Sequence, residues 1–372
     1  MIELVIISLL LVFLLNYLAF LWNLRKGLSS LSHSRSIATP YASVIIAARN
    51  EEKNIEQCLH ALIGQSYNPQ KFQVIVVDDH SQDKTAELAT RLAESTPDPK
   101  ISVVSLKDQA GKPAAIAHGV SISKGEVILC TDADCTVPKR WIESMVGCFD
   151  PTVAFVAGPV LERPSGSLIS KLQALEYLGL TTTAAGLIGS GNPIICSGAS
   201  IAYRKAAFAS VNGYGDHSSS CDDETLMQRM ALRDAGQIMF NADSSAVVST
   251  QTPSDVSEFW RQRTRWATKR GRYEDASVLR RLLLLYGFFL VLFLAGIVAL
   301  VDPILRFPVV VVVVLKALAE LHVLSQGARL YRQSISLGQF FIAELFHVPY
   351  IAVAGLIGQF STLRWKDRNL DR

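Results

Sequence analysis

Short apolar runs alternate with amphipathic stretches between residues 41 and 160. The apolar runs are rich in β-branched residues and too short for helices, which is typical of buried strands. They are ASVIIAA at 42–48, QVIVVDD at 73–79, ISVVSL at 101–106 and EVILCTD at 126–132. The helical patterns between them are Glu51–Ile63, Thr85–Ala93 and Pro113–Ser123. Strands separated by such helices predict βαβ units, and therefore an α/β domain with a mainly parallel sheet.

Polar residues follow three of these runs at the point where each strand ends. They are Arg49-Asn50-Glu51, Asp78-Asp79 and Asp132-Ala133-Asp134. The carboxyl ends of parallel strands lie at one edge of a sheet, where α/β proteins bind their ligands. Carboxylates gathered there repel one another unless a cation or a set of donors lies among them. Oxygen ligands suit Mg²⁺ or Mn²⁺, which share their coordination with phosphates, so the pattern predicts a nucleotide diphosphate with a divalent metal.

Two cysteines flank the third acidic group, and they raise zinc as an alternative. Cys130 and Cys135 have a spacing close to that of zinc ligands, and spacing alone does not exclude them. Strand alternation, however, places Cys130 and Asp132 on one face, with one of the two inside the core, and no second Cys or His pair lies nearby. The six cysteines of the chain show no repeated spacing, so we interpret them as reduced thiols of a cytosolic domain.

Two further polar groups lie beyond residue 190. The stretch NPIICSGASIAYR at 192–204 predicts a strand and a Gly turn, and Asp222 and Asp223 open an amphipathic helix. Carboxylates in a first turn are favoured by the helix dipole, so this pair alone indicates ordinary capping. The stretch WRQRTRWATKRGRY at 260–273 predicts a basic amphipathic helix on anionic lipid headgroups. The cations available to lipid would be Arg261, Arg263, Lys269, Arg270 and Arg272.

Residues 4–22 are apolar over the length of a membrane-spanning helix. Glu3 precedes this run and basic residues such as Arg25 and Lys26 follow it, which is the reverse of a secretory signal. The positive-inside rule places the amino terminus outside and the later residues in the cytoplasm. We therefore expect a membrane anchor at 1–25.

A second membrane region is expected at 282–360. Leu282–Val301 and Phe307–Leu324 are separated by a short loop and predict a helical hairpin. Lys316 and Glu320 lie one helical turn apart in the second segment, where pairing would lower the cost of burying each charge.

The segment 340–360 is a weaker candidate because it contains Glu344, His347 and Pro349. A full crossing would place the basic tail of the chain outside, against the positive-inside rule. A re-entrant, an interfacial and a spanning helix therefore all stay open for this segment.

The composition narrows the class of partner. The chain has 372 residues, a net charge of +3 and 19% charged residues, so no strongly basic surface points to nucleic acid. The mean hydropathy of +0.27 is high for a purely soluble protein and agrees with the membrane segments.

Four short motifs follow one another along the chain. VVDDHSQDKT (76–85) resembles DDxSxDxT, DAD (132–134) resembles DxD, CDDETL (221–226) resembles the TED or EDxxL element, and QRTRW (262–266) matches QxxRW. ARNEEKNI (48–55) and GKPAAIAHG (111–119) match two weaker motifs. In this order they resemble the membrane-bound family-2 glycosyltransferases, which include cellulose, hyaluronan and chitin synthases and ceramide glucosyltransferase. The resemblance covers about residues 41–275.

The resemblance implies a GT-A fold, a Mg²⁺ or Mn²⁺ cofactor and a set of site residues. The implied nucleotide-binding residues are Glu51, Asp78, Asp79, Lys112 and Asp132. Asp134, helped by Asp132, would hold the metal, which stabilises charge on the departing diphosphate. Asp223 would be the general base that takes the proton from the acceptor hydroxyl. The implied diphosphate and acceptor residues are Gln262, Arg265, Trp266, Ser197, Gly198 and Asp222.

The implied reaction is inverting transfer of a sugar from a nucleotide-diphosphate sugar to a lipid, lipid-linked or glycan acceptor, at the cytoplasmic face of a bacterial inner membrane. A processive polysaccharide synthase is the alternative, which QxxRW permits and the few membrane segments weaken. A non-catalytic membrane scaffold of the same fold is a third hypothesis, disfavoured by the intact Asp134, Asp223 and Arg265. CDD replaces the TED of many members, which keeps the base and leaves the role of Asp222 open.

Overall fold

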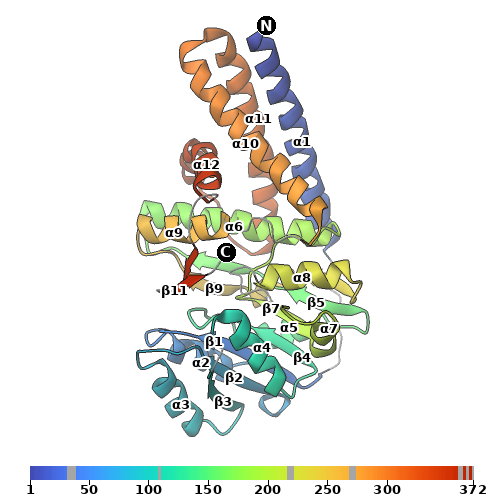
Figure 1. Ribbon diagram of the computed structural model, residues 1–372, viewed down its shortest axis with the longest axis vertical. Coiled ribbons are helices and arrows are strands. Elements are labelled where there is room, and N and C mark those ends of the chain that lie inside the picture. Colours follow the sequence, from blue (N-terminus) through green and yellow to red (C-terminus); the bar gives the residue numbers. More distant parts are fainter. Residues whose placement is uncertain are drawn as a thin grey trace.

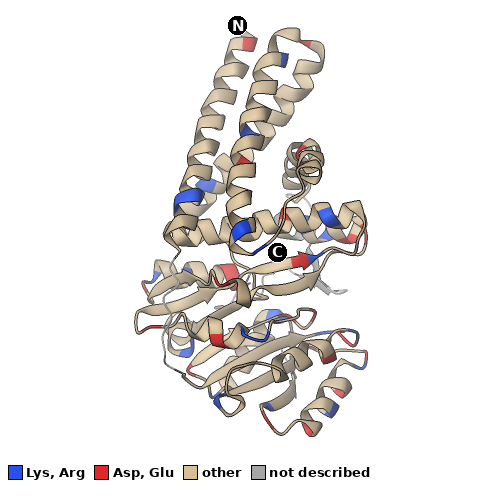
Figure 2. Ribbon diagram, turned by 180° about the vertical axis from the view of Figure 1, so that it is seen from behind, with Lys and Arg blue, Asp and Glu red and all other residues tan. Residues whose placement is uncertain are grey.

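The computed structural model describes residues 1–31, 39–107, 110–215, 222–267, 274–358, 363–365 and 368–370. It consists of an α/β part and a bundle of long helices that stands on one side of it (Figure 1). Charged residues are frequent in the α/β part and sparse on the long helices (Figure 2). The distribution of charge therefore matches the α/β domain and the apolar membrane segments that the sequence predicts.

A mixed sheet of seven strands forms the centre of the α/β part, in the order β3-β2-β1-β4-β7-β5-β8. Its strands are β1 (Ala42–Ala48), β2 (Phe72–Asp78), β3 (Lys100–Ser105), β4 (Val127–Cys130), β5 (Val153–Ala157), β7 (Ile201–Arg204) and β8 (Gln237–Phe240). The first four strands are parallel to one another, whereas β7 is antiparallel to both β4 and β5. The predicted α/β fold with a mainly parallel sheet is confirmed.

Helices cover both faces of this sheet, which explains why its central strands are mostly apolar. These helices are α2 (Ile55–Ile63), α3 (Thr85–Ser95), α4 (Lys112–Ile122), α5 (Trp141–Val146), α7 (Lys205–Ser210) and α8 (Asp222–Leu232). Val44 and Ile46 of β1 pack with α2 and α5, whereas Ile45 between them packs with α4 and α8. Successive side chains of a strand point to opposite faces, and here both faces are buried.

Helix α2 begins at Ile55, one turn later than the expected Glu51. The backbone N–H of Glu51 donates to Thr85 Oγ1 at 2.7 Å, which ties this residue to the start of α3. Glu51 therefore lies in the turn at the end of β1, at the sheet edge where the polar residues were expected to gather.

A smaller layer lies between the main sheet and the bundle. It contains the parallel pair β6 (Val160–Arg163) and β9 (Val248–Gln251), and the helices α6 (Leu168–Gly189) and α9 (Val256–Ala267). Both helices run crosswise beneath the long helices (Figure 1). The remaining short elements are β10 (Leu363–Trp365), β11 (Arg368–Leu370) and 3₁₀ turns at Pro69–Lys71 and Ser244–Ala246.

Four described helices are long and apolar enough to cross a membrane. They are α1 (Ile2–Ser30), α10 (Ala276–Val301), α11 (Pro303–Leu330) and α12 (Leu337–Gly358). The first three stand upright side by side, whereas α12 is seen nearly end-on and so runs across them (Figure 1). Helix α12 packs against α10 of the bundle and against α6 and α9 below it.

The end of α1 crosses the end of α6 at backbone contact. A Cβ atom at Gly27 would lie 1.8 Å from the carbonyl oxygen of Gly186, and one at Gly189 would lie 2.2 Å from that of Gly27. Only glycine allows such an approach, so the small residues fix the anchor helix directly on α6.

A buried cluster of charges joins three of the long helices. The ammonium of Lys316 on α11 lies 2.9 Å from Glu320 Oε2, 2.7 Å from Glu344 Oε2 and 3.1 Å from His347 Nδ1, and its side chain is fully buried. Tyr17 of α1 donates to Glu320 Oε1 at 2.5 Å. The predicted pair of Lys316 and Glu320 is confirmed, and the structure adds the two partners from α12. Two of the three N–H donors of the ammonium are thus taken by carboxylate oxygens.

Replacing Lys316 by methionine should lower the thermal unfolding midpoint of the full chain in detergent. The change leaves two buried carboxylates without their cation, and breaking a buried pair costs on the order of 3–5 kcal/mol. Lys171→Met, on the exposed side of α6, is the matched control and should leave the midpoint unchanged. The midpoints of both variants are measured by stepwise heating, with the remaining folded protein determined by size-exclusion chromatography. Equal midpoints for the two variants would contradict the role of Lys316.

Candidate active site

A cavity of about 400 Å³ lies at the carboxyl ends of β1 and β4, below α6 and α9. Its wall is formed by the ends of these strands, the loop before β7, the first turns of α4 and α8, and one side each of α6 and α9. Nine of the predicted site residues line it: Glu51, Lys112, Asp132, Asp134, Ser197, Gly198, Asp223, Gln262 and Trp266. Motifs that are up to about two hundred residues apart along the chain thus meet in one cavity.

Asp78 and Asp79 lie beneath the cavity wall and do not line it. Both are buried, and Asp79 accepts a hydrogen bond from the backbone N–H of Gly111 at 3.0 Å. Gly111 precedes the first residue of α4, which is Lys112, so Asp79 holds the start of the helix that carries this lysine. The predicted contact of Asp78 and Asp79 with a nucleoside stays a prediction.

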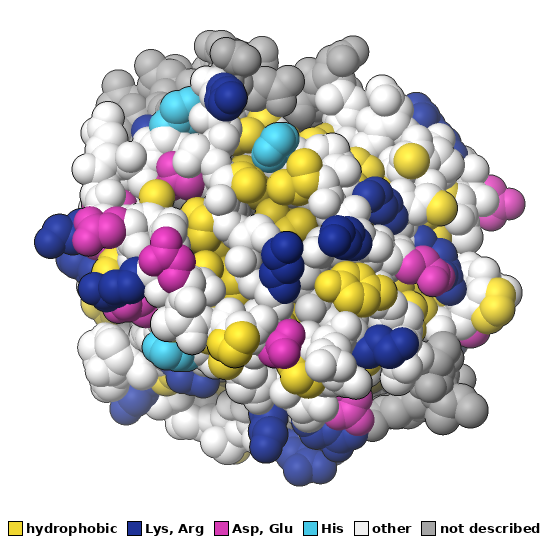
Figure 3. Space-filling view, turned by 90° about the horizontal axis from the view of Figure 1, so that it is seen from below, with side chains coloured by type: hydrophobic (Ala, Val, Ile, Leu, Met, Phe, Trp, Pro, Cys, Tyr) yellow, Lys and Arg dark blue, Asp and Glu magenta, His cyan; other side chains and the backbone are white. Residues whose placement is uncertain are grey.

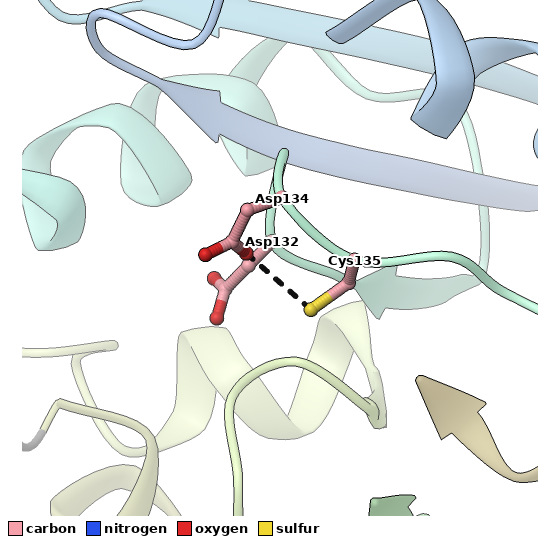
Figure 4. A group of neighbouring side chains, drawn as sticks. All are labelled: Asp132, Asp134 and Cys135. Carbon is pink, nitrogen blue, oxygen red and sulfur yellow. Dashed lines mark hydrogen bonds between the residues drawn. The ribbon is translucent and has the colours of Figure 1, made fainter. Parts of the chain in front are cut away.

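Asp132 and Asp134 follow β4 in a tight turn, which the backbone hydrogen bond from Cys135 N to Asp132 O closes at 3.1 Å. The alternation across Ala133 places both carboxylates on the same side of the loop (Figure 4). A ligand oxygen from each of them and Cys135 Sγ lie within 4.8 Å of one another. The two aspartates therefore offer oxygen ligands to one cation.

The thiol of Cys135 is not suited to bind that cation. It is buried and donates to Asp134 Oδ1 at 3.4 Å (Figure 4). Burial, together with the charges of Asp134 and Asp132, raises the pKa of Cys135 well above its ordinary value. A thiol is also a softer ligand than the oxygens that suit Mg²⁺ and Mn²⁺. Burial also raises the pKa of Cys130 to about 12. The interpretation of these cysteines as bystander thiols fits both observations.

Lys112 places a positive charge between the two acidic motifs. Its Nζ lies 2.7 Å from Asp132 Oδ1 and 3.4 Å from Asp223 Oδ2. The ammonium of Lys112 is therefore a cation among the carboxylates, as the sequence pattern requires. The carboxylate oxygens are also suitable ligands for Mg²⁺ or Mn²⁺. Asp132 and Asp134 would hold the metal, with water and a diphosphate as the remaining ligands.

Asp223 approaches Lys112 across Gly198. A Cβ atom at position 198 would lie 1.7 Å from Asp223 Oδ2 and 2.8 Å from Lys112 Nζ, so a side chain there would displace both. Asp223 Oδ1 is buried and has no hydrogen-bond partner among the described residues. One oxygen of this carboxylate therefore faces the lysine, and the other keeps its lone pairs for a ligand.

Helix α9 brings Gln262 and Trp266 to the cavity. Trp266 packs edge-on against Tyr177 of α6, with ring centroids 6.2 Å apart, and supplies the expected apolar surface. The side chains of Arg265 and Asp222 lie outside the described part of the structure, as do residues 268–273. Their predicted contacts therefore stay predictions.

Arg263 corrects the expectation that the cations of α9 face lipid. It is 3% exposed, and its guanidinium forms hydrogen bonds to both carboxylate oxygens of Glu176 on α6. The basic pattern of this stretch did not reveal the inward partner, because Glu176 lies 87 residues earlier in the chain.

Sequence reasoning assigned no role to α6, although four of its residues line the cavity. They are Tyr177, Leu180, Thr181 and Ala184. The helix packs between the cavity and the long helices α1 and α11, so apolar and small residues occupy most of its circumference. Such a helix carries no motif. The absence of a polar face in its sequence was the one indication that other parts of the protein cover it on both sides.

Comparisons with known proteins agree with this geometry. Residues 43–211 match the model of the family described as "Glycosyl transferase family 2". A "Poly-beta-1,6-N-acetyl-D-glucosamine synthase" of Staphylococcus aureus is 28% identical over 228 residues, which cover 60% of this chain and 53% of that protein. "Glycosyltransferase AglE" of Haloferax volcanii is 37% identical over 122 residues, which cover 32% of this chain and 40% of that protein. The chain spans about half the length of the curated relatives it matches.

A solved structure with a similar fold is that of a mannosyltransferase from Pyrobaculum calidifontis in complex with GDP-Man and Mn²⁺. The two superpose with a TM-score of 0.60 over 97% of this chain and 99% of the other, at 20% sequence identity. At this identity the likeness shows the fold, and together with the family match it confirms the predicted GT-A architecture.

Asp134→Asn should weaken binding of Mn²⁺ in the presence of a nucleoside diphosphate, whereas Cys135→Ala should leave it nearly unchanged. The first variant loses an oxygen ligand, with an expected cost of about tenfold or more in affinity, and the second loses only a protonated thiol. Titration calorimetry with purified protein measures both affinities. An equal loss of Mn²⁺ affinity in the two variants would contradict the assignment of the metal to the aspartates.

Proposed function

We propose that this chain is an inverting glycosyltransferase of family 2, because its residues 43–211 match the model of glycosyl transferase family 2. It moves a sugar from a nucleotide-diphosphate sugar to a lipid or lipid-linked acceptor at the cytoplasmic face of a membrane. The observation that carries this proposal is the pair formed by Asp223 and the Asp132-Asp134 turn in one cavity. Asp223 is a carboxylate with an oxygen that can accept a proton. The Asp132-Asp134 turn offers carboxylate oxygens that can bind a cation.

Asp223 is the general base in this proposal. Its Oδ1 is buried without a hydrogen-bond partner among the described atoms, while Oδ2 faces the ammonium of Lys112. The lone pairs of Oδ1 accept the proton of the acceptor hydroxyl as its oxygen attacks the anomeric carbon.

The departing diphosphate develops negative charge, and the cavity offers two sources of positive charge for it. Asp132 and Asp134 would hold Mg²⁺ or Mn²⁺, which acts as a Lewis acid on the leaving group when bound. Mn²⁺ is bound in the Pyrobaculum mannosyltransferase of similar fold, which supports the choice of metal. Lys112 adds a second cation, whose contact with Asp132 lies beside the diphosphate position.

The lipid acceptor is supported by the position of α6. One side of this helix lines the cavity with Tyr177, Leu180 and Ala184, and its other sides pack on α1 and α11. Leu180 is 36% exposed, so an apolar residue leads from the cavity to the surface beneath the bundle. An acceptor hydroxyl carried by a membrane lipid would approach Asp223 along this side of α6.

The proposed membrane placement has α1, α10 and α11 crossing the bilayer and α12 lying along its cytoplasmic boundary. The crosswise direction of α12 and its packing on α6 and α9 support the interfacial reading of this segment (Figure 1). Arg25 and Lys26 stack on Trp22 at the end of α1 nearest the cavity, an arrangement typical of the cytoplasmic interface. We place the protein in a bacterial cell membrane, with the cavity in the cytoplasm.

The face turned away from the bundle supports the same orientation. Lys, Arg, Asp and Glu are interspersed on it without a broad area of one sign (Figure 3). A water-facing surface of mixed charge is expected of a cytoplasmic domain, and it offers no basic track for nucleic acid.

Processive synthesis of a polysaccharide is the second candidate. The similarity to a poly-β-1,6-N-acetyl-D-glucosamine synthase over 60% of this chain favours it, and the motif QRTRW permits it. The chemistry at Asp223 and the metal site is the same in both candidates, so only the acceptor distinguishes them.

Asp223→Asn should lower the rate of sugar transfer by about 100-fold or more, because it removes the general base, while nucleotide affinity stays close to that of the parent. Asp234→Asn is the matched control; this aspartate is exposed after α8 with a φ of 50°, a conformation that asparagine tolerates. Initial rates with a labelled nucleotide sugar and calorimetric titration with the nucleoside diphosphate measure the two effects. Turnover of Asp223→Asn at the parent rate would contradict the base assignment.

Purified full-length chain, supplied with membrane lipids, Mn²⁺ and a panel of labelled nucleotide sugars, should move label into an organic-soluble product. This outcome follows from the apolar wall that leads to the cavity. Label retained in a high polymer would favour the processive synthase, and absence of turnover by folded protein would overturn both candidates in favour of a scaffold.

A further inference from the structure

Arg263 contacts both residues of the QRTRW motif that line the cavity. Its Nη1 donates to Gln262 Oε1 at 2.6 Å. Its guanidinium carbon lies 4.3 Å from the centroid of the Trp266 ring and 4.8 Å from that of Phe259. Arg263 itself is buried and does not line the cavity, so it acts on any ligand only through these neighbours.

The contact between Arg263 and Gln262 fixes which end of the amide faces the guanidinium. A guanidinium has five N–H donors and no acceptor, so the atom of Gln262 that it holds must be the carbonyl oxygen. The NH₂ group of Gln262 is thereby left as the free end of the amide. Gln262 lines the cavity, so its NH₂ group is the end of the amide that can still donate a hydrogen bond to a ligand there.

Glu176 on α6 holds the guanidinium in place. Arg263 Nε and Nη2 donate to its two oxygens at 2.8 to 3.2 Å, a two-pronged pairing that fixes the plane of the guanidinium. Tyr350 of α12 donates to Glu176 Oε1 at 3.0 Å. The orientation of Gln262 thus depends on α6 and, through Tyr350, on the helix that crosses the bundle.

A second carboxylate, Glu162 of β6, lies near Arg263 and does not hold it. The closest approach is 4.0 Å, from Arg263 Nη2 to Glu162 Oε1, and neither oxygen of Glu162 has a hydrogen-bond partner among the described residues. Burial raises the pKa of Glu162 to about 7, against the opposing charge of Arg263. Glu176 is therefore the carboxylate that orients the guanidinium.

We propose that Arg263 is a positioning residue of the transfer reaction: it turns Gln262 so that its NH₂ group donates to an oxygen of the bound nucleotide sugar, and it fixes the ring of Trp266. The inference rests on the proposed function, since it needs a nucleotide sugar in the cavity. The inference gives a role to Arg263, which occupies one of the two variable positions of QxxRW. The NH₂ group of Gln262 stabilises the transition state more strongly if it is already held in place before the nucleotide sugar binds.

The test is a double-mutant cycle on the full chain in detergent with Mn²⁺ and the nucleotide sugar that supports turnover. Gln262→Ala should lower kcat/KM by about tenfold in the parent background and by less than about twofold in the Arg263→Met background, because Gln262 is no longer oriented there. Arg91→Met, at an exposed position of α3, is the matched control and should leave the parent rate unchanged.

Gln262→Glu serves as the second variant because it leaves the buried pairs intact. A carboxylate at this position still accepts from Arg263 but presents an acceptor to the cavity in place of a donor, so we expect a loss at least as large as that of Gln262→Ala. Turnover of Gln262→Glu near the parent rate, or an equal cost of Gln262→Ala in both backgrounds, would overturn the positioning role and leave the proposed function standing. A folded parent chain that neither turns over nor binds any nucleotide sugar would overturn both.

Discussion

Burial of carboxylates next to a cation is the interaction on which this structure depends. Three cations each pair with at least one carboxylate and have a second acidic side chain nearby, at successive levels of the molecule. Lys112 lies between Asp132 and Asp223 in the cavity, Arg263 near Glu176 and Glu162 in the layer above it, and Lys316 between Glu320 and Glu344 among the long helices. Removing water from a charge costs several kcal/mol unless an opposite charge and hydrogen bonds replace it, so each cation fixes the elements that supply its partners.

These contacts tie the catalytic layer to the membrane helices. Lys316 holds α12 against α11, and one turn further along α12 Tyr350 reaches Glu176 on α6. Glu176 in turn orients Arg263 on α9, whose neighbours Gln262 and Trp266 line the cavity. The backbone contact between Gly27 and Gly186 fixes α6 to α1 at its other end. The cavity wall formed by α6 and α9 is thus fixed from both sides.

Much of this arrangement could be predicted from the sequence. The apolar runs revealed the strands of the parallel half of the sheet, and the ends of β1 and β4 carry Glu51, Asp132 and Asp134 to one cavity as expected. Lys316 and Glu320 pair as their helical spacing indicated. These features depend on contacts that are local in the chain, or on the rule that parallel strands share an edge.

The features that escaped prediction depend on tertiary packing. The basic pattern of α9 is compatible with a lipid-facing helix, and only the position of Glu176 on α6 turns Arg263 inward. Nothing in the pattern of α6 marks it as a cavity wall, because it is apolar on the side of the ligand and on the side of the bundle. Asp79 accepts a hydrogen bond from the backbone of Gly111, a contact that no short motif reveals, and its predicted contact with a nucleoside stays a prediction.

The most direct test of the central claim is a structure of the full chain determined with a nucleotide sugar and Mn²⁺ bound. The account predicts the diphosphate beside Asp132 and Asp134, and Asp223 on the side of the sugar ring opposite the diphosphate. Nucleotide bound outside the cavity, or a sugar whose anomeric carbon is turned away from Asp223, would contradict it.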